Sequence, residues 1–506
     1  MPTNLAQLLT ETAFRHGDRP ALKLDDSILT YDMLNEGATR VAGLLKERGL
    51  GPGDRVGVML PNVPYFGAVY YGVLRAGGVV VPMNVLLKGR EVSFYLSDSG
   101  ARLMFAWHGF AESAEEGAEK SGTEVIVVKP GEFEALLAGA SRHSDDLDRD
   151  PSDTAVILYT SGTTGTPKGA ELTHANMLDN CFYGGTELVN ISEQDVGLGA
   201  LPLFHSFGQT CCLNTSVRAG ACLTLIPRFE PDKALEIIQR DRVTLFDGVP
   251  TMYHAMLNYP DRDRYDVSSL RLCLSGGSAM PVEVMRGFEQ AFGCMILEGY
   301  GLSETSPVAS FNQRDRERKP GSIGTPIRGV EMKVVDDAGN ELPQGDVGEI
   351  AIRGHNVMKS YWNRPDATAE VLKDGWLLTG DMARMDEDGY FFIVDRKKDM
   401  IIRGGFNVYP REIEEVLYEH PAVLEAAVIG VPDEALGEDV AAAVVLRSGH
   451  DASADDIQGF VKERLAAYKY PRHVWFTGEL PKGPTGKILK REIPTSDVPG
   501  REMARH

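Results

Sequence analysis

Residues 160–169 bring hydroxyl groups, glycines and one lysine together, directly after the apolar segment 154–159. Glycines let backbone N–H groups surround an anion, hydroxyl groups add hydrogen-bond donors, and a lysine adds mobile positive charge. The Walker A pattern is not matched, because Thr166 and Pro167 precede the lysine and a glycine follows it. A polar surface loop is the open alternative. We predict a phosphate-binding loop of another kind, formed by Thr160, Ser161, Gly162, Thr163, Thr164, Gly165 and Lys168.

Further motifs follow this loop in order along more than three hundred residues, at 202–208, 298–305, 348–350, 379–381, 395–399 and 484–487. Together they resemble the signature of the adenylate-forming (ANL) superfamily, which includes acyl-CoA synthetases, coumarate-CoA ligases, luciferases and peptide-synthetase adenylation domains. A single match has little weight, whereas a collinear set of this length is specific. The resemblance implies an ATP-dependent carboxylate–CoA ligase.

The implied chemistry has two steps. A carboxylate attacks the α-phosphate of ATP to give an acyl-adenylate and pyrophosphate, and the thiol of coenzyme A then displaces AMP. Both steps need charge neutralisation more than a protein nucleophile, so we expect cations and hydrogen-bond donors. The resemblance gives catalytic roles to Lys487, Glu304, Lys168 and His205.

The nucleotide site is implied by the same motifs. Tyr300 would stack on adenine, Asp381 would bind both ribose hydroxyls, and Arg396 would reach ribose or phosphate. Glu304 and Thr163 would hold Mg²⁺, which prefers hard oxygen ligands. By residue type alone, Tyr300 is a core aromatic, Asp381 a turn residue and Glu304 a solvated carboxylate. The other implied nucleotide-binding residues are Glu298, Gly299, Gly301 and Ser303, with Gly276, Gly277 and Ser278 at a strand end where a plain tight turn is the alternative.

The second step is implied to need a new face of a small C-terminal domain. Lys487 would bridge the carboxylate and the α-phosphate in the first step and then leave, although a loop lysine is otherwise usually solvated. Lys398 aligns with the hinge of the family, and Gly404 and Gly405 would let pantetheine pass close to the backbone. His205 would gate the acyl tunnel, or be a satisfied, partly buried histidine.

The elements that must position these residues alternate between strand and helix. Apolar runs predict strands at 54–60, 78–82, 123–128, 154–159, 221–226 and 270–274, and helical spacing predicts a helix at 62–75. This βαβ rhythm predicts an α/β fold of parallel-type sheets flanked by helices. The polar segment 139–150 is predicted to be a linker.

The chain is too long for one core, so we expect two or more domains. A large N-terminal domain is predicted at 1–394, a solvated joint at the charge cluster 395–399, and a small α+β domain at 400–495. The resemblance implies the same division, with the hinge in the charge cluster and a mobile C-terminal domain. In that domain we expect a helix opening at Pro410, strands at 423–431 and 439–446, and a helix at 454–467. Residues 496–506 are predicted to be a frayed tail.

Composition limits the partners and the compartment. A net charge of −21 disfavours nucleic acid and anionic membranes. Six cysteines without zinc spacing indicate reduced thiols, and neither a signal peptide nor a membrane span is evident, so we expect a cytoplasmic enzyme without a transmembrane anchor. The expected cofactors and partners are ATP, Mg²⁺, coenzyme A and a small carboxylic acid, and a homodimer is the candidate assembly.

The expected substrate is a medium- or long-chain fatty acid, because an apolar acyl site is suggested by Leu203, Phe204, Phe207, Leu213 and Val249. An aryl acid of the coumarate or benzoate kind would also fit such a lining. A ligase that loads a carrier protein is a further alternative. A nucleotide-binding regulator without catalysis is disfavoured, because Lys168, Glu304 and Lys487 are all present.

Overall fold

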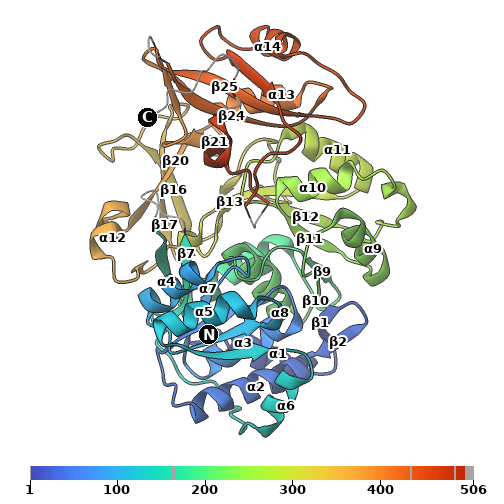
Figure 1. The fold of residues 1–506 in the computed structure, drawn as a ribbon, viewed down its shortest axis with the longest axis vertical. Coiled ribbons are helices and arrows are strands. Elements are labelled where there is room, and N and C mark those ends of the chain that lie inside the picture. The colour runs from blue at the N-terminus through green and yellow to red at the C-terminus, as the bar shows by residue number, and fades with distance from the viewer. Residues whose placement is uncertain (1, 161–165, 434–435, 484–485, 496–497, 499–506) are drawn as a thin grey trace.

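The computed structural model describes residues 2–160, 166–433, 436–483, 486–495 and 498. The chain forms a large N-terminal domain and a smaller C-terminal domain that lies over one end of it (Figure 1). Two mixed sheets and one antiparallel sheet build the large domain. The expected α/β class is therefore confirmed, although the sheets are mixed rather than wholly parallel. Within the described ranges, no helix combines the length and the apolar character needed to cross a membrane.

The first mixed sheet contains the start of the predicted phosphate loop. Its strand order is β18-β8-β7-β4-β3-β5-β6, parallel from β7 to β6 and antiparallel at β8 and β18. The predicted strands at 54–60, 78–82, 123–128 and 154–159 are confirmed as β3, β4, β6 and β7. Helices cover the sheet, which explains the almost continuous apolar runs of its parallel strands. The strands are β3 Arg55–Met59, β4 Val79–Pro82, β5 Leu103–Trp107, β6 Glu124–Val128, β7 Thr154–Thr160, β8 Lys168–Thr173 and β18 Ser360–Tyr361; the helices between them are α3 Pro64–Arg75, α4 Gly89–Ser99, α5 Ala111–Ser121 and α6 Glu132–Gly139.

The second mixed sheet has the order β15-β14-β13-β12-β11-β9-β10-β1-β2. Its pairing is parallel from β13 to β1 and antiparallel at β14, β15 and β2. The predicted strands at 221–226 and 270–274 are confirmed as β10 and β12. The strands are β1 Pro20–Leu24, β2 Ser27–Thr30, β9 Val196–Gly199, β10 Cys222–Leu225, β11 Leu245–Gly248, β12 Leu272–Ser275, β13 Met295–Gly301, β14 Val308–Phe311 and β15 Thr325–Pro326; the helices are α1 Gln7–His16, α2 Tyr31–Glu47, α7 His174–Asn180, α8 Thr215–Ala219, α9 Pro231–Asp241, α10 Pro250–Leu257 and α11 Val282–Phe292.

The antiparallel sheet connects the two domains. Strand β20 pairs with β17, β19 and β21, and β16 forms the far edge. The predicted hinge, 395–399, covers the end of β21 and the connection to the next strand. The elements of this part are β16 Val330–Val335, β17 Gly348–Gly354, α12 Pro365–Val371, β19 Leu372–Lys373, β20 Trp376–Met385 and β21 Phe391–Arg396.

The C-terminal domain has its own sheet and its own buried apolar clusters, which start at Ile401. The helix expected at 454–467 ends earlier, at Lys462, and just beyond it the Arg464 N–H bonds to the Val461 carbonyl in a tighter, three-residue turn. The domain contains β22 Ile401–Arg403, β23 Phe406–Val408, α13 Pro410–Tyr418, β24 Val423–Asp433, β25 Gly437–Leu446, α14 Ala454–Lys462 and β26 His473–Phe476.

The predicted linker has no helix or strand after α6, but it is packed into the large domain. Arg75 of α3 is fully buried, and its Nε lies 2.8 Å from Oδ1 of Asp146. The hydroxyl of Thr10 donates to the same carboxylate at 2.7 Å, and the Asn4 amide donates to the Leu147 carbonyl at 2.8 Å. Removing the Asp146 carboxylate would leave the buried charge of Arg75 without its ion pair, which is costly.

Candidate active site

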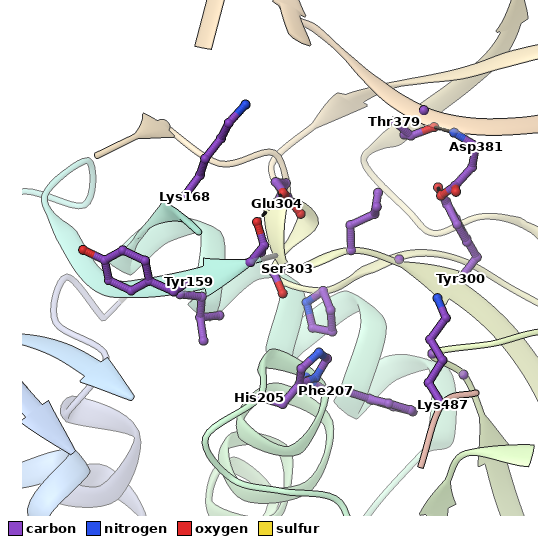
Figure 2. Close-up of a pocket in the computed structure, with 18 of the residues that line it drawn as sticks. Tyr159, Lys168, His205, Phe207, Tyr300, Ser303, Glu304, Thr379, Asp381 and Lys487 are labelled. Atoms are coloured by element: carbon purple, nitrogen blue, oxygen red, sulfur yellow. Dashed lines mark hydrogen bonds between the residues drawn. The ribbon is translucent and has the colours of Figure 1, made fainter. Parts of the chain in front are cut away.

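A cavity of about 900 Å³ lies where the sheets of the large domain meet the loop that carries Lys487. Figure 2 shows Lys168 and Glu304 on one side, Tyr300, Asp381 and Lys487 on the other, and His205 with Phe207 between them. Most of the predicted site residues therefore come together. The described ones that line this cavity are Thr160, Lys168, His205, Gly276, Gly277, Gly299, Tyr300, Gly301, Ser303, Glu304, Asp381, Arg396, Lys398 and Lys487.

A smaller cavity of about 240 Å³ shares part of this wall and is also lined by Ser278 and Glu298. Predicted residues Ser161, Gly162, Thr163, Thr164 and Gly165 lie outside the described residues. Gly404 and Gly405 form an exposed turn between β22 and β23 and line neither cavity. Both adopt positive φ, at 56° and 84°, a backbone region that favours glycine.

The cavity lies beyond the carboxyl ends of β11, β12 and β13, the edge at which open parallel sheets bind ligands. Gly276 follows β12, and a Cβ atom built there would lie 3.1 Å from Cε1 of Phe207. The Phe207 ring thus packs directly on this backbone. Glycine at 276 is explained by that contact rather than by an unusual turn.

Glu304 is bound from two directions at one oxygen. Its Oε1 accepts hydrogen bonds from the Tyr361 hydroxyl at 2.9 Å and from the Thr160 hydroxyl at 3.3 Å. Burial and the neighbouring Glu304 raise the pKa of Tyr361, so its hydroxyl stays protonated and donates. The ammonium of Lys168 lies 5.3 Å from the centroid of the same ring. Tyr361 therefore contacts both residues predicted to neutralise phosphate charge.

Sequence reasoning missed Tyr361, and no local signal marks it. The residue lies on β18, which pairs with β8 through Tyr361 and Ala170. That pairing of distant segments brings its ring next to Lys168. Only knowledge of the strand partner would have identified it.

Asp381 is almost completely buried and engaged at both oxygens. Tyr300 donates its hydroxyl to Oδ2 at 2.6 Å, and the Nε of Arg396 lies 3.2 Å from Oδ1. Burial first and Asp381 second raise the pKa of Tyr300, so the phenol stays neutral. A carboxylate has about four acceptor positions, so both oxygens can still accept from a ligand.

Glu349, within the motif at 348–350, holds the turn that carries Asp381. Its Oε1 accepts the N–H of Gly380 at 2.8 Å, and its Oε2 lies 3.2 Å from the ammonium of Lys397. The same carboxylate thus fixes the Asp381 turn and contacts the predicted hinge. The motif at 348–350 has no separate role in the sequence prediction.

Lys487 reaches the cavity from the C-terminal domain. The hydroxyl of Thr251 donates to the Gly486 carbonyl at 3.1 Å and holds the loop against α10. Burial, then the positive charge of Arg396, lowers the pKa of Lys487 to about 8. The ammonium is therefore the main form at neutral pH, but its pKa lies only about one unit above that pH.

Burial shifts the pKa values of two side chains near the cavity, His205 and Glu298. His205 Nδ1 accepts the N–H of Phe207 at 3.2 Å, and burial together with Lys487 lowers the pKa of His205 to about 4, so it is neutral. Glu298 accepts the N–H of Met280 at 2.9 Å with Oε1, and its Oε2 has no hydrogen-bond partner in the described part of the chain. Burial raises the pKa of Glu298 to about 7.

The apolar wall of the cavity contains Phe204, Phe207 and Val249, as predicted, together with Leu201 and Val308. Two other predicted residues do not line it. Leu203 and Leu213 are completely buried within the core of the large domain.

Tyr300, Asp381 and Lys487, from three separate motifs, meet at one cavity of a two-domain α/β fold, which is the arrangement of an adenylate-forming enzyme. The AMP-binding enzyme model matches residues 9–362, and the model of the AMP-binding enzyme C-terminal domain matches residues 412–487. The chain belongs to this family, among the acyl-CoA synthetases of the adenylate-forming superfamily.

Similar proteins cover almost the whole chain. A long-chain-fatty-acid–CoA ligase of Bacillus subtilis (strain 168) is 40% identical, over 97% of this chain and 94% of its own. A feruloyl-CoA synthase of Amycolatopsis is also 40% identical, over 95% of both chains. The ATP-bound crystal structure of MatB from Rhodopseudomonas palustris aligns with a TM-score of 0.90 at 35% identity, over 97% of this chain and 98% of that one.

Proposed function

We propose that this AMP-forming acid–thiol ligase activates a medium- or long-chain fatty acid. The observation that carries the proposal is a single cavity with a charged end, at Lys168, Glu304 and Asp381, and an apolar wall beside His205. The Bacillus relative named for long-chain fatty acids supports it. An aryl acid is the second candidate, because the feruloyl-CoA synthase is equally identical.

In the first step, an oxygen of the acid's carboxylate attacks the α-phosphate, and the bond to pyrophosphate breaks. The Lys487 ammonium would lie between the two negative reactants and reduce their repulsion. Lys168 and the predicted loop would bind the departing pyrophosphate. His205, which is neutral, would border the path of the acid without adding charge.

Glu304 fits a Mg²⁺ site shared with a nucleotide. Its Oε2 accepts no hydrogen bond from the described residues. Among the described residues, no group of three or more His, Cys, Asp or Glu side chains is placed to hold a metal ion by itself. Mg²⁺ is commonly held by one or two carboxylates plus substrate phosphates, so one carboxylate suffices. When bound by Glu304, with Thr163 as the second predicted ligand, the ion would neutralise phosphate charge.

The nucleoside would lie between Tyr300 and the Gly276–Ser278 turn, with its ribose hydroxyls on Asp381 and Arg396 beside it. The second step would follow rotation of the C-terminal domain about Lys398, which would withdraw Lys487 and bring Gly404 and Gly405 toward the thiol of coenzyme A. The proposed bounds of the two domains that move relative to each other are 1–394 and 400–495.

Two further proposals concern the whole molecule. The six free thiols, five of them buried, fit the reducing cytoplasm. A homodimer remains a prediction that sedimentation equilibrium would test.

The experiment is AMP and pyrophosphate release across fatty, aryl and dicarboxylic acids, each with and without coenzyme A. Release that needs coenzyme A and is fastest with fatty acids of medium or long chain supports the proposal. A preference for aryl acids would establish the second candidate instead. ATP binding without turnover on any acid would contradict both.

A further inference from the structure

Helix α13 of the C-terminal domain faces the large domain across the smaller cavity. Four of its residues line that cavity, opposite Ser278 and Glu298 of the large domain. Because they lie three or four positions apart, they share one face of the helix: Arg411, Glu414, Glu415 and Tyr418. The orientation of this helix therefore decides how the C-terminal domain lies against the large domain.

The side chain of Arg411 crosses the boundary between the two domains. Its Nη1 donates to the Ile393 carbonyl at 2.9 Å, and its Nη2 donates to the Gly321 carbonyl at 3.4 Å. The side chain is largely buried, with 12% exposed. A guanidinium has its donors in a rigid fork, so it can hold two acceptors in one geometry. We call these two bonds the Arg411 clamp; both acceptors belong to the large domain, so rotation of α13 would break them.

The start of α13 is also bonded to the predicted hinge. The N–H of Arg411 donates to Oδ2 of Asp395 at 3.1 Å, and Oδ1 of the same carboxylate accepts the Arg396 N–H at 2.7 Å. Asp395 thereby joins the first turn of α13 to the last residue of β21. Rotation about Lys398 would break the bond to Arg411 and leave the bond to Arg396 in place.

The same helix holds the segment that carries Lys487. Oε1 of Glu414 lies 2.7 Å from the ammonium of Lys490 and also accepts the Val428 N–H at 2.7 Å. Lys490 follows Lys487 by three residues. These contacts form one path from the carbonyls of the large domain, through Arg411 and α13, to the loop of Lys487.

Other bonds across the boundary are weaker in kind. The Thr251 hydroxyl donates to the Gly486 carbonyl, and Arg447 donates to the Asn258 side chain at 3.0 Å in an exposed position. A neutral hydroxyl and an exposed arginine contribute less than two bonds from a largely buried guanidinium. The Arg411 clamp is therefore the contact on which this orientation depends most.

We propose that Arg411 is a positioning residue for adenylation, because its clamp fixes α13 and thereby holds Lys487 in the cavity. The inference rests on the proposed function, in which Lys487 serves the first step and leaves before the second. It assigns the choice between the two orientations to a side chain whose partners are backbone carbonyls. The clamp must open before thioester formation can begin.

The test measures the two half-reactions of the full-length enzyme separately. Pyrophosphate exchange reports adenylation of the fastest acid of the panel, which is expected to be a fatty acid such as dodecanoic acid. Single-turnover thioester formation from the supplied adenylate of that acid and coenzyme A reports the second step. Arg411→Met should slow adenylation about 10- to 100-fold, because two bonds from a charged donor are lost, and should not slow thioester formation.

Two further variants make the comparison specific. Lys490→Met should show the same division between the steps, because it breaks the path at its other end. Arg464→Met is the matched control, since Arg464 bonds to the Phe460 carbonyl within the C-terminal domain. Both of its half-reactions should stay near the wild-type rates.

Combining Arg411→Met with Lys487→Ala checks that the clamp acts through the lysine. The double variant should exchange pyrophosphate at the rate of Lys487→Ala alone, because the clamp then has no lysine to place. A further tenfold loss in the double variant would overturn the inference.

Unchanged adenylation in Arg411→Met would also overturn it. So would an equal loss of both half-reactions in that variant, which would indicate a damaged domain rather than a misplaced lysine. A wild-type enzyme that exchanges no pyrophosphate with any fatty or aryl acid would instead contradict the proposed function.

Discussion

The two ends of the cavity differ in their polar groups. At the nucleotide end, Glu304 is held by Tyr361 and Thr160, and Asp381 by Tyr300 and Arg396. At the apolar end, Phe207 and Val249 form the wall, and the neutral His205 beside it accepts the Phe207 N–H. A set of mutually bonded groups is fixed before substrate arrives, which favours charge stabilisation without reorganisation. The apolar end instead selects among acids by the shape and length of the chain that it can bury.

The largest expected effect comes from the loop of the C-terminal domain that carries Lys487 to the nucleotide end. Lys487→Ala should reduce adenylation about 100- to 1,000-fold, because a buried cation beside the reacting groups is lost. Thioester formation from supplied acyl-adenylate should be spared. Pyrophosphate exchange and single-turnover thioester formation measure the two steps.

Lys482→Ala is the matched control, because Lys482 lies five residues before Lys487 but outside the large cavity. Its ammonium instead pairs with Glu425 at 2.6 Å. It should leave adenylation near the wild-type rate. Equal loss of both steps in Lys487→Ala would contradict the division of roles between them.

The pH dependence should reveal the same lysine. Since the charged form is required and its pKa is about 8, kcat/KM for adenylation should be level below that pH. Above it, the rate should fall toward about tenfold per pH unit as the ammonium loses its proton. Lys487→Arg, which stays charged, should abolish the decline in whatever activity remains. A decline that persists in the arginine variant would assign it to another group.

Tyr361→Phe would break one of the paired contacts at the nucleotide end. Removing the hydroxyl takes away the shorter of the two hydrogen bonds to Glu304 and leaves the longer one from Thr160, so binding of Mg²⁺-ATP should weaken about tenfold. Calorimetric titration with Mg²⁺-ATP and with Mn²⁺-ATP measures this directly. Tyr390→Phe is the control, because the Tyr390 hydroxyl bonds to the Glu317 carbonyl outside the cavity, and its affinity should not change. Unaltered binding in the Tyr361 variant would show that Glu304 needs no positioning.

The smallest expected effect concerns the length of the acid. Phe207→Ala should enlarge the apolar end of the cavity and improve kcat/KM for longer acids, by about fourfold for each added methylene that becomes buried. A series of alkanoic acids compared between variant and wild type measures the shift. An unchanged length optimum would place the acid along another wall.

Much of the fold follows from local pattern. The strands around 54–60, 78–82 and 270–274 have apolar runs and clear boundaries, so their type was predictable from sequence. The antiparallel pairing of β7 with β8, and of β13 with β14, was not, because a strand's partner and direction depend on segments elsewhere in the chain. The sheets are mixed for this reason.

The site divides in the same way. Glu304, Asp381 and Lys487 stand in recognisable motifs, and the structure brings them to one cavity. Tyr361 acts across two paired strands, and the predicted wall residues Leu203 and Leu213 lie in the core instead. Both outcomes depend on how distant segments pack, which neighbouring residue types do not determine. The apolar wall is therefore the part of the site that sequence describes least well.

The packed segment that follows α6 bears on how this chain can vary. A free spacer tolerates changes in length. Here, however, Asp146 must form its ion pair with Arg75 while the Leu147 carbonyl accepts the hydrogen bond from Asn4. Inserting or deleting a residue between 140 and 146 would shift the carboxylate by about 3 Å and strand a buried guanidinium. In this segment, register matters more than composition, so substitutions can accumulate where length cannot change.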